Sequence, residues 1–298
     1  MRIGFIGLGT MGLPMAQHLM RAGHSLGAYA RRAEALAPLT ATGATAFATP
    51  GELAAASDVV ITMVTATPDV DQVLFASRGV MTGAHRGLLV IDMSTIAPPA
   101  AIAFAARLRD AGVAMLDAPV SGGPAGARDA KLTIMAGGSA DAFERARPLF
   151  ESLGTNIFHV GDNGAGQITK ACHQLLLLVT AEGVAEALSL AGAAGVDPGL
   201  VRQVMMTGIA SSRVLDLFGG RMAARQFEPG ISVRLYRKDL QIVRDLATSA
   251  GVSTPAGEVV AANVQKLVSE GLEREDLAAL IKVLEQTATG YRLPTSGD

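Results

Sequence analysis

The stretch that decides the fold is Ile3-Gly4-Phe5-Ile6-Gly7-Leu8-Gly9-Thr10-Met11-Gly12, which ends in the pattern G-x-G-x-x-G. The apolar run Ile3–Ile6 predicts a buried strand before the glycines, and the spacing over Met11–Ala22 predicts a helix after them. A glycine-rich turn between a strand and a helix presents backbone N–H groups at the helix N-terminus, where an anion can bind. A turn with no ligand is the alternative, and the flanking strand and helix favour the anion-binding turn.

Each glycine of this turn has a separate expected role in holding a dinucleotide. Gly7 permits the tight turn, Gly9 lets the backbone approach a pyrophosphate, and Gly12 lets the helix pack closely on the strand. The sequence therefore predicts a dinucleotide-binding turn made of Gly7, Leu8, Gly9, Thr10, Met11 and Gly12.

The end of the next predicted strand indicates which dinucleotide is bound. Sites specific for NAD usually place Asp or Glu there to accept hydrogen bonds from the ribose, but this chain has Tyr29-Ala30-Arg31-Arg32. A guanidinium group matches the geometry of the 2′-phosphate that distinguishes NADP. We therefore predict NADP as the cofactor, with Arg31 and Arg32 at its 2′-phosphate and NAD as the second choice. Two solvated surface arginines are the alternative.

The pattern of alternating strands and helices continues outward from the turn and predicts a parallel sheet. Further buried strands are expected at Ser25–Tyr29, Val59–Met63, Leu88–Asp92 and Ala114–Asp117, with helices at Pro68–Ala76 and Pro98–Ala111. Two more strands, Leu132–Ala136 and Asn156–His159, flank a helix at Ala140–Ser152 and are expected to extend the same sheet. The fold class predicted is α/β, with an N-terminal Rossmann-type doubly wound sheet followed by an all-helical C-terminal domain.

The second half of the chain contains no convincing strand after Gln167. We expect a domain boundary between residues 163 and 164, marked by glycines, with residues 1–163 binding the cofactor and residues 164–298 all helical. A long helix is predicted at about residues 164–194. Further helices are predicted at Pro198–Met206, Ser212–Met222, Val233–Ala250, Pro255–Glu270 and Glu275–Glu285.

Composition excludes several classes of protein. Of 298 residues, 49% are hydrophobic and 17% are charged, which suits two packed domains. The net charge of −2 gives no basic excess, so a nucleic-acid partner is not expected. Cys172 is the only cysteine, which makes an internal disulfide impossible and fits a reducing cytoplasm.

A membrane span is the alternative reading of the apolar stretch Ala171–Ala194. This stretch carries His173, Glu182 and Glu186, which a bilayer would have to bury at high cost. A buried core helix is therefore favoured, and no signal peptide is expected because the chain opens with a strand pattern.

Two motifs suggest where a substrate is bound. Asp117-Ala118-Pro119-Val120-Ser121-Gly122-Gly123 follows a strand and offers a hydroxyl and two unhindered backbone N–H groups, a cradle for a carboxylate. Gly164-Ala165-Gly166-Gln167-Ile168-Thr169-Lys170 opens the long helix, and Lys170 is one of five lysines against twenty arginines. A lysine in an apolar stretch is costly unless it is used, although a snorkelling lysine is the alternative.

These motifs resemble those of the β-hydroxyacid dehydrogenases, and the resemblance covers nearly the whole chain. The family's turn continues as x-x-M-A, which is present as Met15-Ala16, and its D-A-P-V-S-G-G loop and G-x-G-x-x-x-K helix are both matched. The resemblance implies that Ser121, Gly122 and Gly123 hold the substrate carboxylate. It implies that Lys170 is the catalytic acid or base. The family usually has Gly where Ala130 stands.

The resemblance also assigns residues further along the chain. Substrate contacts are implied at Gln174, where many members have Asn, and at Asp239 of the K-D-L pattern. His173 is unusual in this family, but Lys170-x-x-His173 resembles the Lys-x-x-His pattern of the longer 6-phosphogluconate dehydrogenases, so His173 is a further candidate substrate contact, with a packed core histidine as the alternative. Cofactor contacts are implied around the Val60–Val64 strand, the D-x-S-T loop and the K-D-L lysine. Their residues are Met63, Val64, Thr65, Ser94, Thr95 and Lys238. A surface ion pair is the alternative reading of Lys238-Asp239.

The expected activity is hydride transfer between NADP(H) and a small β-hydroxyacid or its semialdehyde, without a metal site, since the five histidines show no ligand spacing. The expected partner is a small carboxylate substrate, with a homodimer or homotetramer as the assembly. Two alternatives are an imine reductase, which typically has Asp or Tyr where Lys170 stands, and a non-catalytic dinucleotide-binding module.

Overall fold

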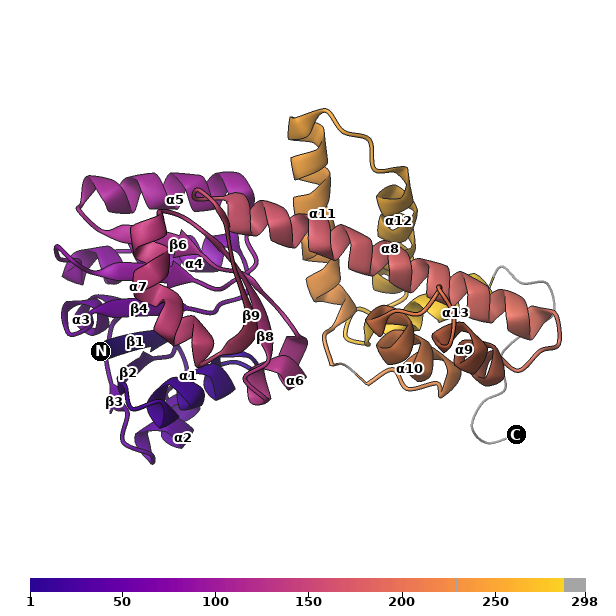
Figure 1. The fold of residues 1–298 in the computed structure, drawn as a ribbon, viewed down its shortest axis with the longest axis horizontal. Helices are drawn as coiled ribbons and strands as arrows, with labels where there is room; N and C mark the ends of the chain where they lie inside the picture. Colours follow the sequence, from indigo (N-terminus) through magenta and orange to yellow (C-terminus); the bar gives the residue numbers. More distant parts are fainter. Residues whose placement is uncertain (229, 287–298) are drawn as a thin grey trace. The chain divides into compact units, whose positions relative to one another are not determined.

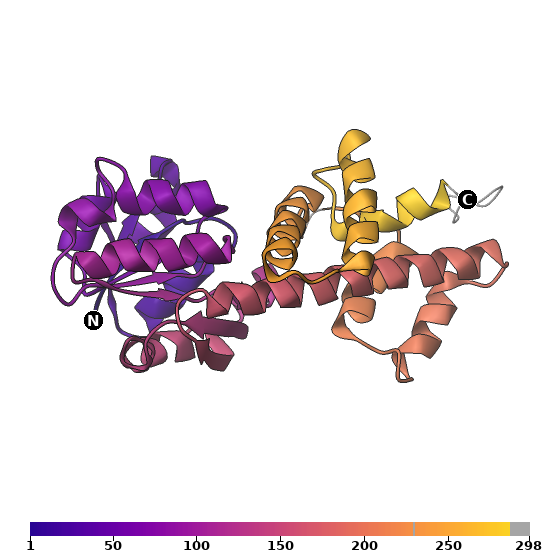
Figure 2. The same cartoon turned by 90° about the horizontal axis from the view of Figure 1, so that it is seen from above.

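The computed structural model describes residues 1–228 and 230–286. The chain divides into two compact units, Met1–Lys170 and Ala171–Asp298. The boundary expected between residues 163 and 164 lies a few residues earlier, just before helix α8 (Ala165–Ala193). Helix α8 therefore begins in the first unit and continues in the second, and Figures 1 and 2 show it as one uninterrupted helix.

The first unit is built on one sheet, whose strands run in the order β3-β2-β1-β4-β5-β6-β8-β7, with β9 paired to β8. Neighbours from β3 to β6 are parallel, and β8 is antiparallel to both β6 and β7. The strand bounds are β1 (Arg2–Ile6), β2 (Ser25–Tyr29), β3 (Thr45–Ala46), β4 (Val59–Thr62), β5 (Leu89–Asp92), β6 (Ala114–Asp117), β7 (Val120–Ser121), β8 (Leu132–Gly137) and β9 (Gly154–Gly161).

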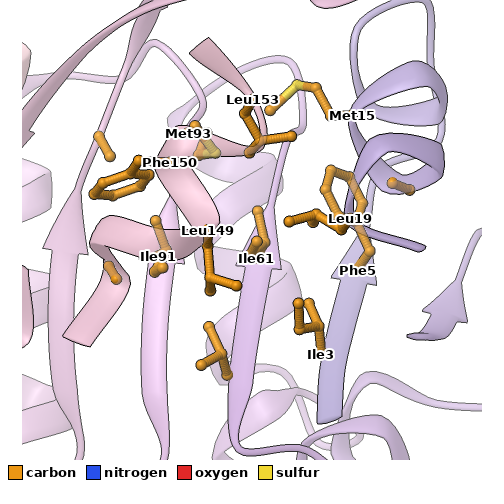
Figure 3. Close-up of a cluster of buried hydrophobic side chains, with 14 of the residues drawn as sticks. Ile3, Phe5, Met15, Leu19, Ile61, Ile91, Met93, Leu149, Phe150 and Leu153 are labelled. Atoms are coloured by element: carbon orange, nitrogen blue, oxygen red, sulfur yellow. The ribbon is translucent and has the colours of Figure 1, made fainter. Parts of the chain in front are cut away.

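Helices cover both faces of this sheet, as Figure 1 shows, because each central strand is apolar on both sides. In β1, Ile3 and Phe5 join the core beneath α1 and α7, whereas Ile6 joins the core beneath α3, α4 and α5. Figure 3 shows the first of these cores, with Leu149 and Phe150 of α7 packed over the strands. The helix bounds are α1 (Gly12–Arg21), α2 (Ala37–Thr40), α3 (Pro50–Ala55), α4 (Thr67–Phe75), α5 (Pro98–Asp110), α6 (Gly123–Arg128) and α7 (Ala140–Glu151), with short 3₁₀ turns at Ala33–Leu36 and Val80–Gly83.

The second unit is helical over its described residues, apart from one isolated bridge between Ser232 and Asp276. Its core gathers Leu178 and Leu188 of α8 with residues of the helices that follow. The helix bounds are α9 (Pro198–Met206), α10 (Gly220–Ala223), α11 (Val233–Ala250), α12 (Pro255–Ser269) and α13 (Leu280–Glu285), with a π-helical turn at Leu215–Gly219 and a 3₁₀ turn at Leu277–Ala279.

The predicted fold class is confirmed: a doubly wound sheet is followed by a helical domain. Every strand expected from the apolar runs is present, and β8 and β9 extend the sheet as predicted. Two predicted helices differ in detail. A π-helical turn interrupts Ser212–Met222, and Glu275–Glu285 begins with a 3₁₀ turn that Asp276 caps by accepting a hydrogen bond from the Ala278 amide.

Helix α8 is the one helix of the described residues that is long and apolar enough to cross a membrane. Its apolar side chains nevertheless form part of the core of the second unit. Glu182, in its interior, is buried and accepts a hydrogen bond from the Asn263 amide of α12. These contacts are those of a core helix, as the charged residues of this stretch predicted.

Candidate active site

The turn between β1 and α1 has the geometry that each of its glycines was expected to provide. Gly7 has a φ of +102°, and a Cβ there would lie 2.1 Å from the carbonyl oxygen of Met63, the residue that follows β4. A Cβ on Gly12 would lie 1.9 Å from the Gly7 carbonyl oxygen, so the helix can pack this closely only without a side chain. At Gly9 a Cβ would meet nothing within 4 Å, which leaves open space beside the backbone.

A cavity of about 650 Å³ opens beside this turn, within the first unit. It is bounded by the turn, by the end of β2, by the loop after β4 and by α4, and a volume of this size suits a drug-sized ligand or larger. The predicted cofactor residues in its wall are Gly7, Leu8, Gly9, Arg31, Arg32, Met63, Val64 and Thr65. Thr10, Met11, Gly12, Ser94 and Thr95 are not part of its wall.

The charged side chains of the cavity are mostly cationic. Arg31 and Arg32 are joined by Arg78, which follows α4 and which the sequence motifs did not single out. The one acidic side chain in the wall is Asp69, in the first turn of α4, whose Oδ1 lies 3.5 Å from Arg31 Nη1. The Arg31 side chain is 74% exposed, so this ion pair is loose. Three guanidinium groups and an open pyrophosphate turn fit a dinucleotide that carries an additional phosphate.

Loops at the carboxyl ends of β4 and β5 are tied together by hydrogen bonds that are buried or partly buried. The Val64 amide donates to Ser94 Oγ at 2.9 Å, and the Ser94 amide donates to Asp92 Oδ1 at 3.1 Å. Thr62 Oγ1 also donates to Asp92 Oδ1, at 2.8 Å. Burial raises the pKa of Asp92 to about 6, although these hydrogen bonds favour the carboxylate. Ser94 therefore acts on the cavity by holding Val64.

The Ser121 loop adopts a backbone that glycine favours. Ser121 ends β7, paired with Thr133 of β8, and Gly122 and Gly123 have φ values of +128° and +59°. Ala130, just after α6, has a φ of +52°, a left-handed conformation in which glycine is strain-free and alanine is not. This positive φ explains why the family usually has glycine at the position of Ala130.

The first turn of α8 is fixed to the end of β6. Asp117 Oδ1 accepts a hydrogen bond from the Gly164 amide at 2.7 Å, and Asp117 Oδ2 accepts one from the Gln167 amide at 3.0 Å. A Cβ on Gly166 would lie 2.4 Å from the Asp117 carbonyl oxygen, which explains the glycine. Lys170 lies one turn further along α8 and is 7% exposed. The structure thus places a buried lysine on a helix whose start is held by a carboxylate.

The remaining predicted substrate residues form a polar cluster in the second unit. Gln174 Nε2 donates to Asp239 Oδ2 at 2.6 Å, and His173 Nδ1 lies 3.0 Å from Gln174 Oε1. Because the Gln174 amide donates through its nitrogen, its oxygen must accept, so His173 carries its proton on Nδ1 in this arrangement. Lys238 Nζ lies 3.0 Å from Asp239 Oδ1. Asp239 is buried, so its pairing with Lys238 is not that of two solvated surface charges.

Acidic, histidine and cysteine side chains do not gather into a metal-binding group of three or more anywhere in residues 1–228 and 230–286. The residues that sequence reasoning missed are Asp69, Arg78 and Gln167. Gln167 was quoted within the lysine motif, but a glutamine one turn before a lysine carries no signal of its own.

Two family models match the chain. One, described as the NAD binding domain of 6-phosphogluconate dehydrogenase, matches residues 2–161. The other, described as NAD-binding of NADP-dependent 3-hydroxyisobutyrate dehydrogenase, matches residues 164–284. A nicotinamide dinucleotide, NADP or NAD, is therefore the cofactor of this chain, as the turn after β1 predicted.

Two relatives and one solved structure match over almost their full length. A 2-hydroxy-3-oxopropionate reductase of Escherichia coli strain K12 is 41% identical, covering 97% of this chain and 98% of its own. An NAD-dependent L-serine dehydrogenase of Pseudomonas aeruginosa is 38% identical, with 96% and 98% covered. The structure of a Mycobacterium tuberculosis 3-hydroxyisobutyrate dehydrogenase with L-serine superposes with a TM-score of 0.87 at 32% identity, over 95% of this chain and 98% of that one.

An imine reductase of Myxococcus stipitatus in complex with NADP⁺ superposes with a TM-score of 0.65 at 21% identity, covering 95% of this chain and all of that one. At this identity the likeness concerns the fold alone. The relatives that are 32–41% identical are a 2-hydroxy-3-oxopropionate reductase, an L-serine dehydrogenase and a 3-hydroxyisobutyrate dehydrogenase. The chain therefore belongs to the β-hydroxyacid dehydrogenase family, NAD(P)-dependent oxidoreductases that act on the CH–OH group of small hydroxyacids or on the corresponding carbonyl.

Proposed function

We propose that this chain reduces 2-hydroxy-3-oxopropionate, or a closely similar semialdehyde that carries a carboxylate, with NADPH. The observation that carries the proposal is the buried Lys170 on a helix anchored by Asp117, in a chain 41% identical over its length to a 2-hydroxy-3-oxopropionate reductase. A lysine this buried is expensive to keep unless its ammonium is used.

Lys170 acts as the proton donor in this proposal. When bound, the dinucleotide supplies the hydride that adds to the carbonyl carbon of the semialdehyde. Lys170 Nζ gives a proton to the carbonyl oxygen as it becomes an alcohol, and the neutral amine then regains a proton from water. In the direction of oxidation, the neutral amine accepts the hydroxyl proton. General acid or base help of this kind contributes roughly a hundred- to ten-thousand-fold to the rate.

The substrate carboxylate is held by the Ser121 loop. The Ser121 hydroxyl and the amides of Gly122 and Gly123 are donors, and the positive φ of both glycines is the observation that supports a cradle of backbone N–H groups there. His173, Gln174 and Asp239 orient the rest of the substrate in this assignment, supported by the hydrogen bonds that fix the Gln174 amide.

The cofactor is assigned to the cavity beside the β1–α1 turn. Gly7, Leu8 and Gly9 in its wall face the pyrophosphate, and Met63, Val64 and Thr65 are further contacts in the wall. Thr10, Met11 and Gly12 complete the turn. Ser94, Thr95 and Lys238 lie outside the wall, and their assignment to the cofactor rests on the resemblance to the family. We assign a preference for NADPH because Arg31, Arg32 and Arg78 give the cavity a cationic wall.

The assembly and the location are proposed on separate grounds. The second unit exposes large apolar side chains, which favours a homodimer or homotetramer with a second copy of this chain as partner. These side chains are Leu176, Leu190, Leu200, Val204, Ile209 and Leu217. The single cysteine and the balanced charge suit a cytoplasmic enzyme that binds neither nucleic acid nor membrane. Light scattering during size-exclusion chromatography tests the assembly, and a monomer at micromolar concentration would overturn it.

A substrate panel run with both cofactors tests the proposed activity. It contains 2-hydroxy-3-oxopropionate, other short semialdehydes, glyoxylate, L-serine and 3-hydroxyisobutyrate for the reverse reaction, and cyclic imines. We expect the highest kcat/KM for 2-hydroxy-3-oxopropionate with NADPH. Turnover of imines alone would support an imine reductase, and cofactor binding without any turnover would support a non-catalytic module.

A further inference from the structure

We propose that Gln167 is a positioning residue, whose buried side-chain amide ties the loop after β5 to the first turn of α8 and so sets where Lys170 lies relative to the cofactor loops. The inference rests on the proposed function, in which Lys170 donates the proton. Gln167 itself is not assigned any contact with substrate or cofactor.

The Gln167 side chain is engaged through both ends of its amide. Its Nε2 donates to the Ser94 carbonyl oxygen at 2.8 Å, and its Oε1 accepts from the Ile96 amide at 3.0 Å. The residue is 1% exposed, so water cannot replace these partners. The loop presents one backbone donor and one backbone acceptor to this side chain. Only a group that both accepts and donates hydrogen bonds can bind both, and a primary amide is such a group.

The loop that Gln167 holds is in turn connected to the cofactor cavity. Ser94 accepts the hydrogen bond of the Val64 amide, and Val64 lies in the cavity wall. A chain of hydrogen bonds, partly buried at Val64 and buried at Gln167, therefore runs from Val64 through Ser94 to Gln167 on α8. Every member of this chain lies in the first unit, as does Lys170.

Helix geometry brings this chain to Lys170. Residues three apart on an α-helix lie on the same side, about 4.5 Å apart along the axis, so Gln167 and Lys170 are neighbours on α8. The backbone of this turn is held independently, because Asp117 accepts from the Gly164 and Gln167 amides. Loss of the Gln167 side chain should therefore leave the start of α8 in place. The loop after β5 would no longer be held at a fixed position relative to Lys170.

The expected effect is a loss of rate without a loss of cofactor binding. A misplacement of about 1 Å can lower a rate by roughly a hundredfold. We expect Gln167→Met, which keeps length and burial but no amide, to lower the single-turnover rate of hydride transfer by about ten- to a hundredfold. The dissociation constant of NADPH should change by less than about threefold, since Gln167 is not in the cavity wall.

The conservative variant Gln167→Glu tests the positioning role through the pH dependence of its rate, which a purely structural role of Gln167 would not change. Its carboxylate accepts from the Ile96 amide but cannot donate to the Ser94 carbonyl oxygen, whereas the protonated carboxyl does both. The ratio of its rate to the wild-type rate should therefore rise as the pH is lowered from 8 to about 5.5. Because this is a ratio of two rates, the effects of titrating groups that both proteins share are removed from its pH dependence.

The experiment compares wild type, Gln167→Met, Gln167→Glu, Lys170→Ala and the control Ser57→Ala by stopped-flow reduction of 2-hydroxy-3-oxopropionate, with NADPH binding measured by fluorescence. Ser57 is a matched control because it is equally buried in the first unit and donates to the Leu53 carbonyl oxygen at 2.6 Å. Ser57→Ala should keep the wild-type rate. If Gln167→Met fails to fold, the pH dependence of the Gln167→Glu ratio decides, and a flat ratio overturns the inference.

The outcomes separate this inference from the function on which it rests. If Lys170→Ala is inactive but Gln167→Met reacts within threefold of wild type, the inference is wrong and the proposed function stands. If Gln167→Met loses NADPH affinity in step with rate, Gln167 supports cofactor binding and does not position Lys170. If Lys170→Ala keeps a tenth or more of the rate, the proposed function itself fails, whatever Gln167→Met does.

Discussion

The preference for NADPH can be tested by replacing Arg31 with alanine. Arg31 lies in the cavity wall beside Arg32 and Arg78, and it forms a loose ion pair with Asp69 at 3.5 Å. We expect Arg31→Ala to weaken NADPH binding and to leave NADH binding almost unchanged, because only NADPH carries the 2′-phosphate.

The magnitude follows from two opposing contributions. A hydrogen bond from a guanidinium to a phosphate contributes about 1.5–3 kcal/mol, and an exposed ion pair such as Arg31–Asp69 contributes at most about 1 kcal/mol that binding must displace. The net loss is therefore about 0.5–3 kcal/mol, or roughly a two- to 150-fold increase in the dissociation constant. Arg32 and Arg78 remain in the variant, which keeps the loss within this range. By the same reasoning, Asp69→Asn should tighten NADPH binding by a few-fold.

Fluorescence titration of both cofactors measures this effect. The matched control is Arg109→Ala, which removes an exposed arginine of the same unit that is not in the cavity wall. It should leave both dissociation constants unchanged, because Arg109 does not line the cavity. Equal losses of NADPH and NADH affinity in Arg31→Ala would refute the assignment of Arg31 to the 2′-phosphate.

Three further predictions concern the substrate loop and the stability of the first unit. Ser121→Ala should raise the KM of the acid substrate and leave NADPH affinity, by fluorescence titration, unchanged; the reverse pattern would mean that the loop is assigned wrongly. Burial raises the pKa of Asp92 from 3.8 to about 6, so the native state binds this proton more tightly than the unfolded chain does. The wild-type protein should therefore lose stability relative to Asp92→Asn as the pH rises from about 4 to about 6. Urea unfolding at several pH values measures this, and a constant difference between the two proteins contradicts it. Ala130→Gly should leave the free energy of unfolding unchanged or raise it by up to about 1 kcal/mol, because glycine adopts a φ of +52° without strain. The control Ala103→Gly, in the middle of α5, should lower the free energy of unfolding by about 1 kcal/mol. If urea unfolding shows equal losses of stability in both variants, the Ala130 backbone is not strained.

The centre of the sheet was predictable because strands β1, β4, β5 and β6 are buried on both faces and so appear as continuous apolar runs. The strands and helices that were not predicted are short. β3 is two residues long and α2 is four, too few to show a period. α3 did leave a signal, since Thr49 caps it by accepting from the Glu52 amide, a pattern that the pair Thr49 and Glu52 shows in the sequence.

Candidate site residues could be recognised in the sequence only where a residue type is unusual for its surroundings. A lysine in an apolar stretch and glycines after a strand stand out, and the structure gives each of them a physical reason in burial or backbone geometry. Asp69 and Arg78 look like ordinary surface charges, because they reach the cavity only when α4 packs beside β4. Gln167 is unremarkable in sequence since its role depends on the Ser94 loop, more than seventy positions earlier.

The most direct test of the proposed mechanism is single-turnover reduction by Lys170→Ala at several pH values, with NADPH binding measured alongside. The rate should fall by roughly a hundred- to ten-thousand-fold, because proton donation is lost. The limb of the pH profile that Lys170 causes should disappear, and NADPH should bind as in wild type, since Lys170 is not in the cavity wall. A variant that keeps a tenth or more of the wild-type rate, with the pH profile unchanged, would show that Lys170 is not the proton donor.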